Sequence, residues 1–209
     1  GKRLALAYSS TSRDEQLANK LGEDSKSQGY PIVSKTLISP KNINQFFDSI
    51  QLGTDSLSKI DAVIILSDDP NIAQATFGFM ESKNLKTPVI VMDSWLYFNF
   101  ASYEMLENQN FVFLGNNSID FNNPNLEVFR NGFNEEYGKY PSLNMHLGYE
   151  LAYWISETIN PTDGFDFRTN LNKDGFNQGK ITYGFDFRDS NNNRYVPVLR
   201  LNNGKLEVN

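Results

Sequence analysis

The stretch VIILSDDPNIAQA, residues 63–75, contains the change of pattern that decides the fold. Its first four residues are apolar at successive positions, which is typical of a strand buried on both faces. Asp69 and Pro70 then favour an N-cap acid followed by proline at the first position of a helix. The stretch therefore predicts a buried strand that ends where a helix begins, which is where α/β proteins usually place their ligands.

The same alternation of apolar runs and helical patterns extends over the first half of the chain. Apolar runs rich in Val, Ile and Leu predict strands at residues 3–8, 32–37, 62–66, 88–92 and 111–114. Helical patterns between them predict helices at residues 14–28, 42–51, 71–83 and about 101–107. The first of these helices has a capping box in which Ser12 is the expected N-cap and Glu15 its partner. We therefore expect an α/β fold with a doubly wound parallel sheet and helices on both faces.

The pattern changes after residue 115. Two longer helices are predicted at about 124–137 and 143–159, and three strands at 180–188, 194–201 and 205–208. Asn203–Gly204 between the last two strands is a hairpin signal, because both central residues of a type I′ turn need a positive φ. We expect residues 1–118 to form a Rossmann-like lobe, and residues 119–209 to form crossover helices and a C-terminal β meander.

Composition excludes several classes of function. The chain has 209 residues and a net charge of −6, from 19 basic and 25 acidic residues, so nucleic acid is a poor partner. It has no Cys and a single His, His146, which excludes thiolate metal sites and makes a His-based metal cluster unexpected. His146 is expected to be structural. No glycine pattern that would wrap a phosphate is present, and Asp68 and Asp69 would repel one. No catalytic constellation, cofactor site or metal site is predicted.

The loops that follow the predicted strands are rich in hydroxyl, carboxylate and aromatic side chains. Asp69 is most simply a helix cap, whereas Asp68 is not needed as a cap and is available to a cation or to Arg13. Trp95, in an aromatic cluster with Tyr97, Phe98 and Phe100, either packs under a loop or forms a wall for an apolar or planar ligand.

The stretch FRNGFNEEYGKYPSLNMHLGYELAYWI, residues 129–155, resembles type I periplasmic binding proteins, and most of all the branched-chain amino acid-binding branch. The resemblance lies in a helix that closes in Tyr137–Gly138, in Pro141 three residues later, and in Gly148–Tyr149, which opens an apolar helix. The stretches at residues 1–10, 61–75 and 87–95 match the strand–loop–helix units of that family's second lobe. Residues 176–208 resemble its closing segment, so the resemblance covers nearly the whole chain.

The resemblance implies one half of a two-lobed clamshell that closes on a small solute and performs no chemistry. The loops that match the family's ligand-contacting loops supply the expected ligand-binding residues: Ser10, Ser12, Arg13, Ser67, Asp68, Asp69, Asp93, Ser94 and Trp95. Two departures argue against an amino acid as the ligand, so the ligand class stays open. The loop that usually carries an acid for the ligand's ammonium group reads Asp93–Ser94–Trp95, and Asp14 replaces the usual glycine of the first loop.

Two functions follow as hypotheses. The first is an extracytoplasmic solute-binding protein of the ABC-transporter type, whose partners are a small-molecule ligand and a membrane transporter. The second is an interaction or regulatory module on the same fold, like the lipoproteins that activate penicillin-binding proteins. Both imply a periplasmic or cell-envelope location. An aromatic-lined, closable cleft favours the first hypothesis, and a cleft plugged by Trp95 or Arg13 favours the second.

The family's first lobe has no counterpart in this sequence, and we expect upstream sequence to be missing. Without that lobe, an apolar face on the two long helices has no predicted cover. We expect the helices to fold back on the single lobe, or a second copy of the chain to cover this face in a homodimer. The residues of the face are Phe129, Phe133, Leu147, Leu151 and Trp154.

Overall fold

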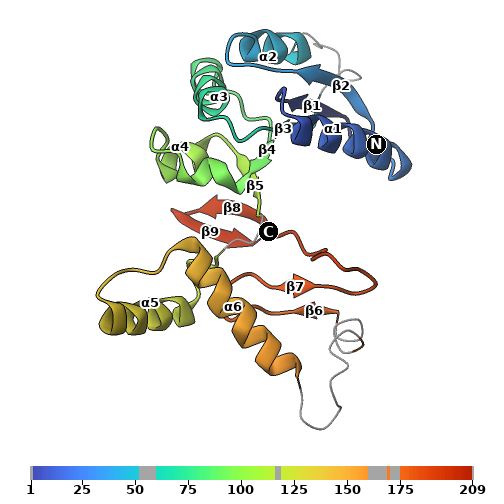
Figure 1. Ribbon diagram of the computed structural model, residues 1–209. Helices are drawn as coiled ribbons and strands as arrows, with labels where there is room; N and C mark the ends of the chain where they lie inside the picture. The colour runs from blue at the N-terminus through green and yellow to red at the C-terminus, as the bar shows by residue number, and fades with distance from the viewer. Residues whose placement is uncertain (1, 52–59, 116–118, 160–168, 170–174, 209) are drawn as a thin grey trace. The chain divides into compact units, whose positions relative to one another are not determined.

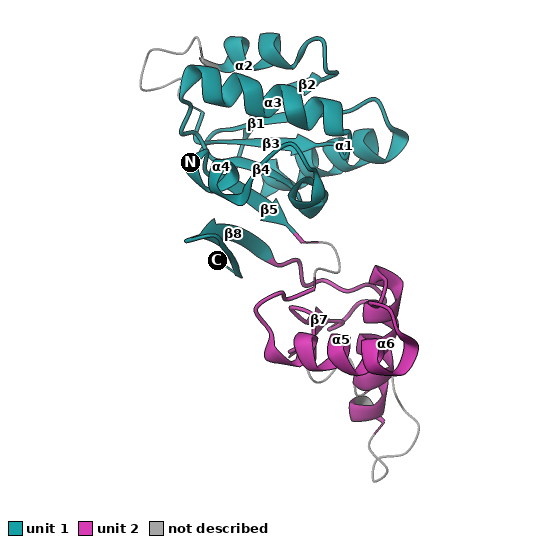
Figure 2. Cartoon of the chain, turned by 90° about the vertical axis from the view of Figure 1, so that its left-hand side faces the viewer, with its two compact units in different colours: residues 1–114, 198–209 teal, residues 115–197 magenta. Residues whose placement is uncertain are grey.

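The computed structural model describes residues 2–51, 60–115, 119–159, 169 and 175–208 (Figure 1). The chain divides into two compact units, coloured separately in Figure 2. Unit 1 comprises Gly1–Leu114 and Val198–Asn209, and unit 2 comprises Gly115–Pro197. The predicted division into residues 1–118 and 119–209 differs from these units. The terminal hairpin belongs to unit 1.

Unit 1 is built on a seven-stranded sheet with the order β2-β1-β3-β4-β5-β8-β9. Its strands are β1 (Leu4–Tyr8), β2 (Ile32–Leu37), β3 (Ala62–Leu66), β4 (Val89–Met92), β5 (Phe111–Leu114), β8 (Val198–Asn202) and β9 (Lys205–Val208). The strands from β1 to β5 pair in parallel, as predicted, and β8 and β9 add an antiparallel edge. The turn at Asn203 and Gly204 has positive φ at both residues, and its two backbone N–H groups donate to the Glu107 carboxylate.

The helices of unit 1 connect successive parallel strands. They are α1 (Ser12–Ser27), α2 (Ile43–Gln51), α3 (Pro70–Lys83), α4 (Tyr103–Asn108) and a short 3₁₀ helix, η1 (Asp93–Tyr97). Asp69 is the N-cap of α3, as predicted, because its carboxylate accepts from the backbone N–H of Asn71 at 2.8 Å. The prediction of Ser12 as the cap of α1 is wrong. Thr11 takes that place and accepts from the backbone N–H of Asp14 at 3.2 Å.

Two apolar layers hold the helices to the sheet. On the face covered by α1, Ala18 packs against Leu6, Ile64 and Leu66. Right-handed crossovers place α2 and α3 on the opposite face, because β2 and β3 lie on different sides of β1. These two helices pack together through the stacked rings of Phe47 and Phe79. The predicted doubly wound, three-layer arrangement is therefore observed (Figure 2).

Unit 2 combines two helices with a short hairpin. Its elements are α5 (Pro124–Tyr137), α6 (Leu143–Thr158), β6 (Phe176–Asn177) and β7 (Phe185–Asp186). A small core of Ile119, Leu126 and Ile181 joins α5 to the residues that precede β7. The predicted C-terminal meander is corrected, since its strands form two separate hairpins. One is β6–β7 in unit 2, and the other is β8–β9 in unit 1.

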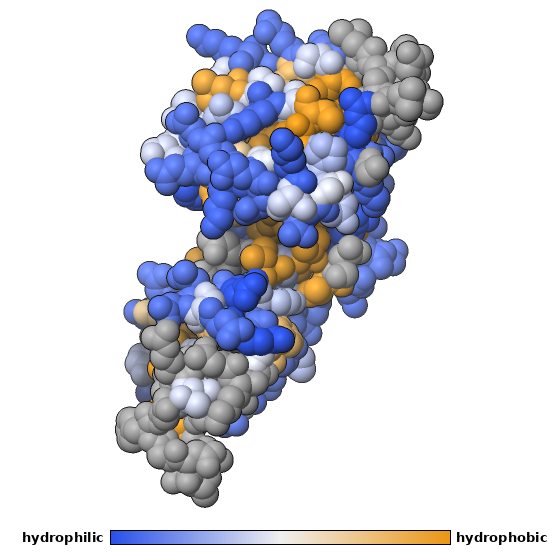
Figure 3. Space-filling model, turned by 90° about the vertical axis from the view of Figure 1, so that its right-hand side faces the viewer, coloured by the Kyte–Doolittle hydropathy of each residue, from blue (hydrophilic) through white to orange (hydrophobic). Residues whose placement is uncertain are grey.

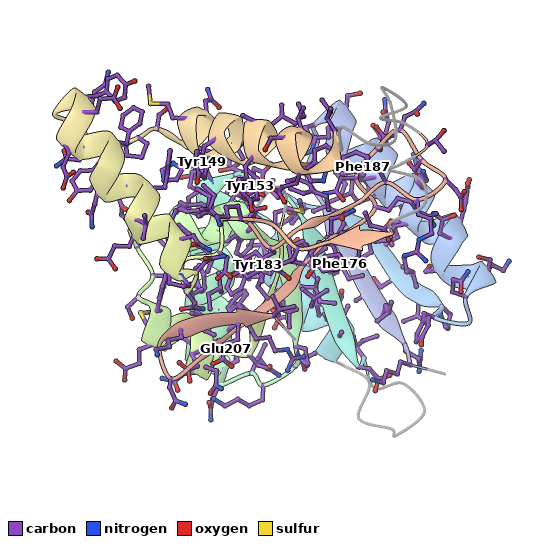
Figure 4. All side chains as sticks on the ribbon, turned by 90° about the horizontal axis from the view of Figure 1, so that it is seen from below. Tyr149, Tyr153, Phe176, Tyr183, Phe187 and Glu207 are labelled. Atoms are coloured by element: carbon purple, nitrogen blue, oxygen red, sulfur yellow. The ribbon has the colours of Figure 1, made fainter. Side chains whose placement is uncertain are left out.

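The predicted single apolar face on α5 and α6 is not observed. Trp154 is buried, and its ring packs against Phe185 and Phe187. Phe129 stacks on Tyr149 of the neighbouring helix, whereas Leu151 is half exposed. Figure 4 shows Tyr149 on α6, on the side that faces the strands of this unit. Much of the predicted face is thus covered within unit 2, and the structure gives no support to the homodimer.

The surface agrees with a chain of low hydropathy. On the face drawn in Figure 3, hydrophilic residues predominate and hydrophobic residues form separate patches. Among the described helices, none combines the length and the apolar composition needed to cross a membrane.

Candidate functional site

The candidate site lies at the point where the strand order of unit 1 reverses. β1 leads to β2 on one side and is paired with β3 on the other, and open α/β sheets bind ligands outside the carboxyl ends of such strands. A hollow of about 490 Å³ occupies this place. It is lined by Ser9, Ser10, Thr11, Arg13, Asp14, Ile38, Ser39, Pro40, Asp68, Asp69 and Ile72.

An ion pair joins two sides of this hollow. Arg13, in the first turn of α1, places its Nη1 atom 2.8 Å from Oδ2 of Asp68, which follows β3. The other carboxylate oxygen of Asp68 accepts a hydrogen bond from the Ser94 hydroxyl in η1. The predicted pairing of Arg13 with Asp68 is thus confirmed. Both side chains are substantially exposed, so the pair contributes at most about 1 kcal/mol to stability, and its main effect is to orient the two groups.

A buried acid forms part of the wall beside this pair. Asp14 is 4% exposed and accepts a hydrogen bond from the Ser9 hydroxyl at 2.6 Å. The Arg13 Nε atom lies 3.7 Å from the same carboxylate. Asp14 stands at the third position of α1, where the partial positive charge of the helix start favours an anion. In the sequence, Asp14 stood out only as a departure from the family pattern. Its position three residues after a hydroxyl cap also indicates an acid in the first turn of a helix.

Two predicted ligand-binding residues lie beneath the site. Ser67 is 1% exposed, and its carbonyl accepts from the Trp95 indole N–H at 2.7 Å. Trp95 is fully buried among the rings of Phe77 and Phe111. Neither residue lines the hollow, and their assignment to ligand binding stays a prediction. They connect the ends of β3 and β4, and Trp95 packs under the loop and does not plug the hollow.

The remaining predicted residues divide into two groups. Ser10 and Asp69 line the hollow together with Arg13 and Asp68. Ser12, Asp93 and Ser94 are not among its lining residues, although Ser94 reaches the site through Asp68. The hollow is also lined by residues that were not among the predicted ligand-binding residues, namely Ser9 and Thr11 after β1 and Ile38, Ser39 and Pro40 after β2.

Asp93 and Tyr97, at the two ends of η1, interact electrostatically. The pKa of Tyr97 is raised, mainly by burial, and the carboxylate of Asp93 raises it further. Tyr97 therefore stays a neutral phenol near neutral pH. The acids that line the hollow are Asp14, Asp68 and Asp69, and Asp93 is not among them.

The chemistry of the lining is that of binding. The carboxylates of Asp14, Asp68 and Asp69 accept hydrogen bonds, the Arg13 guanidinium donates them, and Ile38 and Ile72 are apolar. No described group of three or more His, Cys, Asp or Glu residues is arranged to hold a metal ion. The single His lies in unit 2 and does not line this hollow.

Comparisons with known proteins concern the fold. No protein-family model matches the chain, and no curated protein matches its sequence. It is similar in structure to an ABC transporter substrate-binding protein from Desulfitobacterium hafniense in complex with Leu, at 17% identity and a TM-score of 0.58. It is also similar to a putative branched-chain amino acid ABC transporter from Rhodospirillum rubrum, at 14% identity and a TM-score of 0.67.

A third similar structure is a solute-binding protein of an ABC transporter from R. palustris in complex with 4-hydroxybenzoate, at 12% identity and a TM-score of 0.57. All of this chain is covered in these three comparisons, but it spans only about 60% of the length of those chains. With a mostly parallel sheet and a hollow at its switch point, the chain has the type I periplasmic binding protein fold, as seen in substrate-binding proteins of branched-chain amino acid ABC transporters.

Proposed function

We propose that this protein is a non-catalytic, extracytoplasmic binder of small solutes that works with an ABC transporter. The observation that carries the proposal is the hollow of about 490 Å³ at the carboxyl ends of β1, β2 and β3. Small-molecule sites are concave, partly apolar and furnished with a few polar groups, and they are common at switch points of α/β sheets. The structural neighbours with Leu and with 4-hydroxybenzoate support the same role. A periplasmic or cell-envelope location forms part of the proposal.

The lining suits a ligand with both an acidic and a donating group. Arg13 presents a guanidinium for a carboxylate, and Asp68 presents a carboxylate for an ammonium or hydroxyl group. Ile38, Pro40 and Ile72 offer an apolar surface for the rest of the molecule. An amino acid-like ligand therefore fits the chemistry of the hollow, although the loops depart from the pattern of amino-acid binders.

The second candidate function is an interaction or regulatory module on the same fold. A cleft that is filled by the protein's own side chains would favour this second function, because such a module works through a protein surface and needs no open cleft. Trp95 is buried beneath the loop, and the hollow keeps its volume with the Arg13–Asp68 pair formed. These two observations are consistent with the solute-binding function, but none of the lining residues is aromatic, so the predicted aromatic lining is not present in this hollow.

Two neighbouring acids provide the test. We expect Asp68→Ala to weaken solute binding by about tenfold, since one charge-assisted contact contributes about 1.5 kcal/mol or more, and to leave the melting temperature nearly unchanged. Asp69→Ala should instead cost about 1 kcal/mol of unfolding free energy through the lost cap of α3. Mass spectrometry of co-purified small molecules identifies candidate ligands, and calorimetric titration with L-leucine and 4-hydroxybenzoate gives the first affinities.

The matched pair makes the result decisive. Equal losses of stability in both variants, with no change in solute binding, would remove Asp68 from the site. Failure of the full-length protein to bind any small molecule, combined with capture of a cell-envelope protein that Asp68→Ala abolishes, would favour the interaction module.

A further inference from the structure

Unit 2 contains a second hollow that the proposed solute site does not use. Its volume is about 330 Å³, which is large enough for a ligand built on a single ring. Two aromatic rings, three asparagine amides, one acid and one guanidinium line it. The residues are Phe121, Asn122, Asn123, Pro124, Leu126, Glu127, Arg130, Asn131 and Tyr140.

Arg130 is held in place from behind by a buried histidine. Its Nε–H donates to Nε2 of His146 at 3.0 Å, and Nδ1 of His146 lies 2.8 Å from the Ser142 carbonyl. A carbonyl can only accept, so Nδ1 carries the proton and Nε2 is the acceptor of a neutral imidazole. Burial lowers the pKa of His146, the nearby Arg130 charge lowers it further, and the bond to Ser142 opposes both. The neutral ring thus fixes the guanidinium without neutralising its charge.

The outer part of this guanidinium has no acidic partner among the residues that the structure describes. Within this part of the chain, the guanidinium contacts His146 through its hydrogen bond and lies over the face of the Phe121 ring, whose centroid is 5.4 Å from the guanidinium carbon. Arg13 and Arg188 differ, since each forms an ion pair with an aspartate. The Nη1 and Nη2 groups of Arg130 therefore keep the parallel donor geometry that binds a carboxylate with two hydrogen bonds.

The walls of the hollow suit a ring. Phe121 is 44% exposed and Tyr140 is 72% exposed, so each presents a flat apolar face. Asn131 and Glu127 lie on the same stretch of α5 as Arg130 and offer an amide and a carboxylate to hydroxyl groups. Glu127 would also repel a second negative charge on the ligand.

We propose that this hollow is a second binding site, for small ring-shaped carboxylates that carry hydroxyl groups, such as sugar acids. Arg130 binds the carboxylate, Phe121 and Tyr140 cover the ring, and Glu127 and the asparagines take the hydroxyl groups. His146 is a positioning residue that acts through Arg130. The proposal does not rest on the solute site of unit 1, because the two hollows share no residue.

Titration of the full chain with D-glucuronate, followed by calorimetry and by the NMR signals of the single histidine, tests the proposal. D-glucose is the matched neutral probe and should bind at least tenfold more weakly. Arg130→Gln should weaken glucuronate binding by about tenfold to a hundredfold, which is the value of one hydrogen-bonded charge. Arg130→Lys should lose affinity by a smaller factor, because it keeps the charge but not the paired donors. Arg188→Gln removes the same charge elsewhere in unit 2 and should bind as the parent does.

The positioning role of His146 is tested by separate variants. His146→Gln keeps an acceptor for the Arg130 Nε–H and should retain most of the affinity, whereas His146→Leu should reduce it severalfold. In the parent protein the His146 signals should shift on addition of glucuronate and not of glucose. Thermal melts verify that each variant is folded, and Arg130→Lys decides the question if Arg130→Gln does not fold.

Several results would overturn the proposal. These are the absence of glucuronate binding at millimolar concentration, equal affinity for glucose, and equal affinity of the parent and the folded Arg130 variants. Loss of glucuronate binding in Arg13→Gln would also overturn it, since the probe would then occupy the hollow of unit 1.

Discussion

Replacing Glu150 with alanine should strongly destabilise unit 2. Glu150 is 1% exposed, although it is charged. Its carboxylate accepts three consecutive backbone N–H groups, from Lys180 at 2.8 Å, Ile181 at 2.7 Å and Thr182 at 3.1 Å. This single side chain therefore attaches the segment before β7 to the helix.

The size of the effect follows from these contacts. Hydrogen bonds to a charged acceptor contribute about 1.5–3 kcal/mol each. The contributions of three bonds to one carboxylate are not fully additive, so we expect Glu150→Ala to lower the unfolding free energy by roughly 4–5 kcal/mol. Glu150→Gln keeps one acceptor oxygen and should lose roughly 1–2 kcal/mol. Because domains unfold at a cost of only about 5–15 kcal/mol, the alanine variant should bring unit 2 close to unfolding.

Hydrogen exchange followed by mass spectrometry measures the effect locally. The amides of Lys180, Ile181 and Thr182 should lose protection in Glu150→Ala, and urea unfolding should begin at a lower concentration. Glu157→Ala, an exposed position on the same helix, is the matched control and should change stability by less than about 0.5 kcal/mol. Unchanged protection of the three amides in the folded Glu150→Ala variant would refute the reasoning.

Two further predictions concern unit 2. Gly179→Ala should cost about 1–3 kcal/mol in a thermal melt, because its Cβ would overlap the hydroxyl and carbonyl oxygens of Thr182, whereas Gly148→Ala on α6 meets open space and should be neutral or stabilising. The lowered pKa of His146 means that the unfolded chain takes up its proton first as pH falls through 6.5. The melting temperature should therefore fall more for the parent than for His146→Gln between about pH 7.5 and about pH 5; an equal fall in both would contradict this.

The parallel part of the sheet could be predicted because its signals are local. Successive apolar residues such as those of Ala62–Leu66 need cover on both faces, and helix-length connections leave parallel pairing as the simple solution. The cap at Asp69 is local for the same reason. At α1, Thr11 and Ser12 are both able caps, and the path of the chain out of the buried Ser9 decides between them.

The C-terminal part was predicted less well because its partners are distant in sequence. The sequence of Val198–Asn202 predicts a strand, but no neighbouring residue in the sequence indicates that this strand pairs antiparallel with β5. The buried face of α6 was missed for a different reason. It includes His146 and Glu150, which a search for apolar periodicity passes over, and their burial depends on Arg130 and on the backbone of residues 180–182.

In the candidate site of unit 1, the sequence predicts the loops but not the burial of each residue in them. The sequence identifies the loops after β1 and β3, because polar residues follow buried strands there, but it does not show which side of a loop each residue takes. Ser67 and Asp68 are neighbours, yet Ser67 is buried and Asp68 is exposed. The indole of Trp95 accounts for the difference, since its N–H binds the Ser67 carbonyl and the ring fills the space beneath.

The exposed pair of Arg13 and Asp68 gives the hollow a preference among charged ligands. A lone carboxylate must compete with Asp68 for the guanidinium, and a lone amine must compete with Arg13 for the carboxylate. A zwitterion can replace both partners at once, and opening the pair costs only about 1 kcal/mol because water already reaches both groups. A neutral ligand leaves the pair closed and meets mainly Ile38, Pro40 and the hydroxyl groups. This asymmetry is the physical reason for using L-leucine as the first probe of the hollow.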